Sequence, residues 1–169
     1  MKKNAAQKIA ILGLCTALAM VFSYIEVLIP PIITAIPGIK IGLPNIVIIF
    51  LLYRLGFKEA VIVSLVRVFA VSLLFGNIDT FAYSMAGAVL SLLGMTLLKH
   101  LNWLSVVGVS VAGGVLHNVG QIIMAMVLLG TAEIGYYLII LAITGTISGA
   151  LIGIGGAIVI KRIPLPKQY

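Results

Sequence analysis

The sequence predicts an all-α, polytopic membrane protein, a bundle of six transmembrane helices with both termini in the cytoplasm. Hydrophobic residues make up 62% of the 169 residues and charged residues only 9%, whereas soluble domains are about 45–50% apolar and about 25% charged. The apolar runs are continuous and do not alternate, which indicates helices and not barrel strands. The cationic side chains between the runs fall almost entirely on one side. We therefore expect one integral membrane domain over residues 1–169.

Six apolar segments follow one another along the chain. We expect spans over about residues 9–29, 43–55, 59–75, 80–98, 106–129 and 135–160. A span needs about 20 residues to cross about 30 Å of hydrocarbon, so the second segment is short for a full crossing. The Pro- and Gly-rich stretch PPIITAIPGIKIGLPN precedes it. We expect this stretch to form a structured loop that folds back into the protein at the membrane face. The first run is longer than a typical signal-peptide core and predicts a retained helix.

The cations between the spans predict the orientation. With the N-terminus in the cytoplasm, the external segments hold only Lys40. The cytoplasmic segments hold nine cations, Lys2, Lys3, Lys8, Arg54, Lys58, Lys99, Lys161, Arg162 and Lys167. This is a strong positive-inside bias. It explains the net charge of +7 better than nucleic-acid binding does, because the cations are scattered in short loops. The single cysteine, Cys15, excludes an intrachain disulfide and is expected to pack in the first helix.

A few polar side chains fall at membrane depth, and they are the candidate site. Arg67 lies about nine residues from either end of the third span, near the midplane. His117 and Gln121 are four residues apart and share one helix face, whereas Asn118 lies about 100° round the fifth helix. Asn45 begins the second span. We expect these five residues to bind an anionic or strongly polar small-molecule substrate in the outer half of the bundle, because guanidinium and amide groups suit such ligands.

Structural roles are the alternative for each of these residues. Arg67 and His117 could bond carbonyl groups and hold helices together, because interhelical polar contacts are common in membranes. Asn45 follows Pro44 and could cap a helix. Glu26, at the external end of the first span, is expected to tether a loop or lie at the interface and not to contact a ligand.

Small residues form two stripes. Ala6, Ala10, Gly13 and Ala17 recur at steps of four, three and four residues in the first helix. Gly145, Gly149 and Gly153 recur every four residues in the last helix. Such faces permit close backbone approach. We favour packing within the bundle for the glycine stripe, while the first stripe could equally face a partner protein.

The central block IPGIKIGLPNIVIIFLLYRLGFKEAVIVSLVRVFAVSLLFG resembles a bacterial family known as heptaprenyl diphosphate synthase component I, also called Gx transporter proteins. The resemblance of the chain to this family extends over nearly its whole length. The family is in turn similar to the substrate-binding S components of energy-coupling factor (ECF) transporters. The resemblance implies a multi-pass protein of the bacterial plasma membrane, surrounded by lipid, with six helices and a vitamin-like or precursor substrate.

The same resemblance implies a mechanism and partners. S components bind their substrate from outside, beneath the loop joining the first two helices, which here includes Pro30–Pro37. They then associate with a transmembrane coupling protein and two ABC ATPases. In that family an AxxxA pattern on the first helix contacts the coupling protein. The matching residues here are Ala6 with Ala10 and, with one departure, Gly13 with Ala17, so the docking register stays open.

We do not expect an enzyme, a cofactor or a metal. Prenyl transfer uses Mg²⁺ held by aspartate-rich motifs, and Asp79 is the only aspartate in the chain. A Walker loop is also absent from the sequence, so ATP hydrolysis would belong to a partner. Two alternatives stay open. One is a non-transporting membrane subunit of a quinone- or flavin-linked electron-transfer or isoprenoid/menaquinone pathway complex, and the other is a regulator or anchor of a prenyl synthase.

Overall fold

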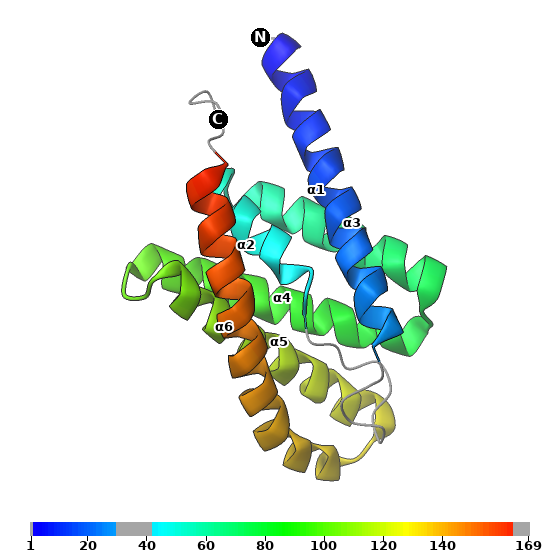
Figure 1. Ribbon diagram of the computed structural model, residues 1–169. Coiled ribbons are helices and arrows are strands. Elements are labelled where there is room, and N and C mark those ends of the chain that lie inside the picture. Colours follow the sequence, from blue (N-terminus) through cyan, green and yellow to red (C-terminus); the bar gives the residue numbers. More distant parts are fainter. Residues whose placement is uncertain (1, 30–41, 164–169) are drawn as a thin grey trace.

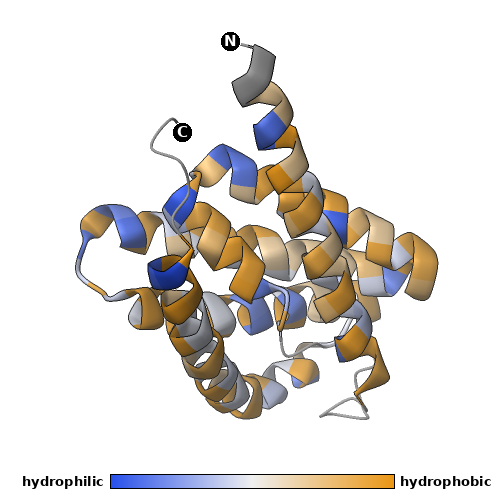
Figure 2. Cartoon of the chain, turned by 45° about the horizontal axis from the view of Figure 1, so that its top comes forward, coloured by the Kyte–Doolittle hydropathy of each residue, from blue (hydrophilic) through white to orange (hydrophobic). Residues whose placement is uncertain are grey.

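The described part of the chain consists of helices and the short segments that join them, without a strand. The structure is a computed structural model and describes residues 2–29 and 42–163. The helices are α1 (Lys2–Leu28), α2 (Asn45–Arg54), α3 (Phe57–Phe75), α4 (Ile78–Leu101), α5 (Val106–Leu129), a short 3₁₀ helix η1 (Ala132–Tyr137) and α6 (Leu138–Arg162). The predicted all-α class is confirmed for these residues. Figure 2 shows that most of each helix is hydrophobic.

Four helices are long and apolar enough to cross a membrane, Ala5–Leu28, Ile78–Leu101, Val106–Leu129 and Ala132–Arg162. The second and third predicted spans differ from these four. Helix α2 has only ten residues, which at about 1.5 Å per residue reach halfway across the hydrocarbon. Helix α3 has 19 residues but carries Lys58, Glu59 and Arg67. Among residues 2–29 and 42–163 there are therefore six α-helices, of which α1, α4, α5 and α6 (the last together with η1) have the length and composition of a full span.

One end of the bundle collects the basic residues. Lys8 of α1 forms a 2.5 Å ion pair with Glu59 near the start of α3. Near the end of α4, Lys99 Nζ donates to the Leu52 carbonyl at 2.6 Å, while Arg54 at the end of α2 donates to the Ile160 carbonyl of α6. We call this end the basic end and the opposite one the outer end. The start of α1 and the end of α6 both lie at the basic end (Figure 1).

Helix α2 is the core of the half of the bundle nearest the basic end. All residues from Val47 to Leu52 are buried, and α2 contacts α1, α3, α5 and α6. Its start lies at mid-depth, because a methyl group at Gly42 would lie 3.9 Å from His117 Cδ2, near the middle of α5. The chain therefore reaches half the depth of the bundle before α2 begins, and α2 fills only the inner half.

Helices α4, α5 and α6 pack most extensively, and glycines allow their close approach. A methyl group at Gly149 of α6 would lie 2.8 Å from both the Ser110 oxygen and the Val111 Cα of α5. One at Gly114 of α5 would lie 2.5 Å from the Gly145 oxygen. The packing interpretation of the glycine stripe in the last helix is therefore confirmed.

We expect Gly149→Ala to destabilise the protein, because the added methyl group overpacks a backbone contact, at a cost of about 1–3 kcal/mol. The matched control is Gly13→Ala, where nothing lies within 4 Å of the new methyl group and alanine is the better helix former. Thermal unfolding in detergent should show a lower midpoint for Gly149→Ala and an unchanged or higher one for Gly13→Ala. Equal midpoints for the two variants would contradict the close α5–α6 approach.

Candidate functional site

The five predicted site residues are all buried. The exposed fractions are 4% for Arg67, 3% for His117 and Asn118, 0% for Gln121 and 8% for Asn45. Helix α3 supplies Arg67, α2 supplies Asn45, and α5 supplies the other three. Arg67 is buried within the bundle, near the middle of α3. A charge in such a position must be compensated by other polar groups.

Glu26, at the end of α1, joins this region to the start of α2. Its Oε1 accepts the N–H of Gly42 and, at 3.3 Å, that of Leu43. Gly42 has φ +92°, a conformation that favours glycine. The carboxylate accepts from two backbone N–H groups that lie outside any helix. It also lies at the positive end of the α2 dipole. The prediction that Glu26 tethers a loop is confirmed for these two residues.

Three polar side chains from three helices, Glu26, Asn45 and His117, lie around Gly42, and Arg67 of a fourth helix interacts with Glu26. A methyl group at Gly42 would lie 3.0 Å from Asn45 Nδ2 and 3.9 Å from His117 Cδ2. The carboxylate of Glu26 also interacts electrostatically with the buried guanidinium of Arg67. Asn45 is the first residue of α2, whose N-cap position is occupied by Pro44, so Asn45 is not the capping residue. We call Glu26, Asn45, Arg67, His117 and Gln121 the polar cluster.

Gln121 belongs to the polar cluster because it lies beside His117 on the same face of α5. A methyl group at Gly87 of α4 would lie 3.0 Å from both Gln121 Cγ and His117 Cε1. The two side chains thus lie on the face of α5 toward α4, as their spacing predicts, and the missing side chain at Gly87 makes room for them.

Asn118 is turned away toward α6. Its Nδ2 donates to the Leu141 carbonyl at 2.7 Å and would lie 2.8 Å from a methyl group at Gly145. This is an interhelical tie of the kind expected of polar residues in membranes. The structure therefore separates Asn118 from the polar cluster, about a quarter turn round the same helix.

Several buried polar atoms have no hydrogen-bond partner among the described residues. They include Nε and Nη2 of Arg67, Oε1 and Nε2 of Gln121, and Oγ of Ser84. Leaving such a group unsatisfied costs about 1–3 kcal/mol, and more for a charged one. Ser84 is a residue that the sequence analysis missed. A serine in an apolar helix gives no signal by itself, because its hydroxyl usually bonds the carbonyl four residues earlier.

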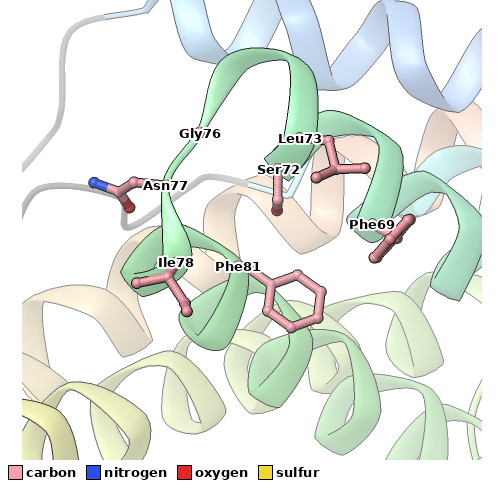
Figure 3. Close-up of a pocket in the computed structure, with 7 residues that line it drawn as sticks. All are labelled: Phe69, Ser72, Leu73, Gly76, Asn77, Ile78 and Phe81. Atoms are coloured by element: carbon pink, nitrogen blue, oxygen red, sulfur yellow. The ribbon is translucent and has the colours of Figure 1, made fainter.

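The pocket in Figure 3 lies elsewhere. It has a volume of about 380 Å³ and lies between the end of α3 and the start of α4, where Phe69 meets the edge of Phe81 with ring centroids 6.4 Å apart. Its asparagine, Asn77, uses its Oδ1 to accept from Thr80 at the start of α4. Pro30–Pro37, the expected cover of the substrate, lies outside the described residues.

The predicted docking stripe on α1 is exposed. Ala6, Ala10, Gly13 and Ala17 are all exposed, and a methyl group at Gly13 would have nothing within 4 Å. No other described helix therefore covers this face.

A family model described as heptaprenyl diphosphate synthase component I matches residues 15–159. Searches of curated proteins and of solved structures gave no match to the chain. The matched range includes the whole polar cluster and α2 to α5.

We expect Glu26→Ala to lower the unfolding midpoint in detergent, because the N–H groups of Gly42 and Leu43 lose their acceptor. Hydrogen bonds to a charged group contribute about 1.5–3 kcal/mol. Glu26→Gln keeps an acceptor oxygen and should lose less. If Glu26→Ala unfolded at the wild-type midpoint, the carboxylate would not be what holds the start of α2.

Proposed function

The chain belongs to the heptaprenyl diphosphate synthase component I family, and we propose that it acts as the substrate-binding S component of an ECF-type importer. The substrate would be a vitamin-like or precursor small molecule bound from outside. The polar cluster is the observation that carries this proposal. It holds donors and acceptors from several helices, and Nε and Nη2 of Arg67 and both amide atoms of Gln121 find no partner among the described residues. A packed membrane protein gains nothing from such groups unless a ligand or water uses them.

The distribution of charge supports the direction of binding. The basic end carries the cations that the positive-inside rule assigns to the cytoplasm. We therefore place both termini on the cytoplasmic side of a bacterial plasma membrane, with six crossings. The polar cluster then lies at and above mid-depth, toward the outside, while the apolar α2 closes the inner half.

The exposed stripe on α1 supports a partner. Its four small residues would let the backbone of a coupling protein approach closely. Two ABC ATPases would provide the energy, since the sequence contains no Walker loop. We do not propose catalysis by this chain, because diphosphate chemistry needs metal-binding carboxylates and Asp79 is the only aspartate.

The alternative is a non-transporting membrane subunit in an isoprenoid, menaquinone or electron-transfer complex, and the family description favours its isoprenoid form. Purification from native membranes separates the two functions. A coupling protein and ATPases in the complex would support the importer, whereas a prenyl synthase or a redox enzyme would support the alternative.

We expect Arg67→Ala to abolish retention of a small molecule by the purified protein while leaving it folded and monodisperse. Gln121→Leu should also lose the ligand, yet unfold at or above the wild-type midpoint, because it removes a buried amide that the protein does not satisfy. The measurement is mass spectrometry of compounds released on denaturation. Asn118→Ala is the matched control, since Asn118 bonds Leu141, and it should keep the ligand at some cost in stability. Unchanged ligand content in Arg67→Ala would refute the site.

We expect Ala10→Trp to block co-purification with a coupling protein while leaving ligand content unchanged, because the indole would hold the two backbones apart. Leu73→Trp is a suitable control, because Leu73 is 70% exposed on a different helix. An intact complex with Ala10→Trp would refute this docking face.

A further inference from the structure

Arg67, Ser84 and Gln121 lie within about one helical turn of one another along the bundle. Helices α3 and α4 run antiparallel, with Ser64 and Ala88 lining a shared groove on one side of Arg67 and Ser84, and Phe69 against Phe81 on the other side. Arg67 and Ser84 fall between these two contacts, each on its own helix. On the next helix, Gln121 packs against Gly87, one turn from Ser84. We call these three residues the polar layer.

Each member of the polar layer is at least 96% buried and carries polar atoms that no described residue satisfies. Their exposed fractions are 4%, 4% and 0%, and the unsatisfied atoms are Nε and Nη2 of Arg67, Oγ of Ser84, and both polar atoms of the Gln121 amide. Helices α3, α4 and α5 thus present unused donors and acceptors within about one helical turn of depth. Because buried polar groups are normally satisfied, this arrangement indicates a ligand with matching groups.

The unused edge of Arg67 indicates the first of these groups. Nε–H and Nη2–H project side by side from one edge of the guanidinium, the arrangement that binds two oxygens of a carboxylate or phosphate at once. Charge balance separates the two anions. Glu26 already offsets the charge of Arg67, so a bound monocarboxylate leaves one negative charge without a counter-charge at membrane depth. A phosphate monoester carries about two charges and would leave both of them, at a higher cost of burial.

The amide of Gln121 indicates the second group. It offers one acceptor and one pair of donors, both unused, and its complement is a group with an adjacent donor and acceptor. Carboxamides, lactams and ureas have this pattern. We propose that the polar layer binds a small monocarboxylate that also carries such an amide-type group. This inference rests on the proposed function and adds the chemical class of the substrate and the role of Ser84 as a further contact.

The test offers purified full-length protein a methanol extract of bacterial cells in three forms, namely untreated, treated with alkaline phosphatase, and methyl-esterified. Bound compounds are separated by filtration and identified by mass spectrometry, with Arg67→Ala as the background. We expect compounds enriched by tenfold or more over Arg67→Ala, as loss of a charge-assisted contact implies. They should carry a carboxylate and an amide-type group, survive phosphatase and disappear after esterification.

Ser84→Ala and Ser91→Ala are a matched pair. Both hydroxyls are buried on α4 without a described partner, but Ser91 lies two turns nearer the basic end. Ser84→Ala should reduce enrichment by severalfold and Ser91→Ala should not. Equal effects of the two variants would overturn the polar layer.

The remaining outcomes separate this inference from the proposed function. Compounds that phosphatase abolishes, or that bind equally well after esterification, would overturn the carboxylate class while leaving a substrate-binding subunit. If the wild-type protein enriched no compound over Arg67→Ala from any extract, the result would contradict the binding function itself and, with it, this inference.

Discussion

The contact between the Glu26 carboxylate and the backbone N–H groups of Gly42 and Leu43 is the constraint on which the rest of the structure depends. Inside a membrane, irregular backbone is tolerated only where the protein satisfies its polar groups. Glu26 does so at the depth of His117, halfway along α5. The chain can therefore begin α2 at mid-depth, and a helix of ten residues can complete the distance to the basic end.

This arrangement divides the bundle into two halves of different character. The inner half is filled by α2, whose Ile48, Ile49 and Leu51 are almost completely buried, and its end is tied to α4 and α6 through Lys99 and Arg54. In the outer half, the described residues include no such helix, and the polar cluster lies there. The unsatisfied atoms of Arg67 and Gln121 lower stability, a cost that proteins accept most readily at functional sites.

The sequence predicts how far along its helix each polar residue lies, but not toward which neighbouring helix its side chain points. Continuous apolar runs predict the helices, and counting residues from their ends places Arg67 and His117 near mid-depth. The four-residue spacing also predicts that His117 and Gln121 share a face. Which neighbours that face meets depends on how α5 is rotated, and the structure turns it toward Gly87 of α4 and Gly42. For the same reason the sequence groups Asn118 with its neighbours, although it bonds α6, and misses Ser84.

The most direct test of this account is the hydrogen exchange of individual backbone amides in the wild-type protein, measured by NMR in micelles. The account predicts that the amide protons of Gly42 and Leu43, although outside any helix, exchange as slowly as those in the middle of α5, because the Glu26 carboxylate holds them inside the bundle. Exchange at the rate of an open loop would contradict it. Gly42 would then not lie at mid-depth, and the polar side chains would not gather around it inside the bundle.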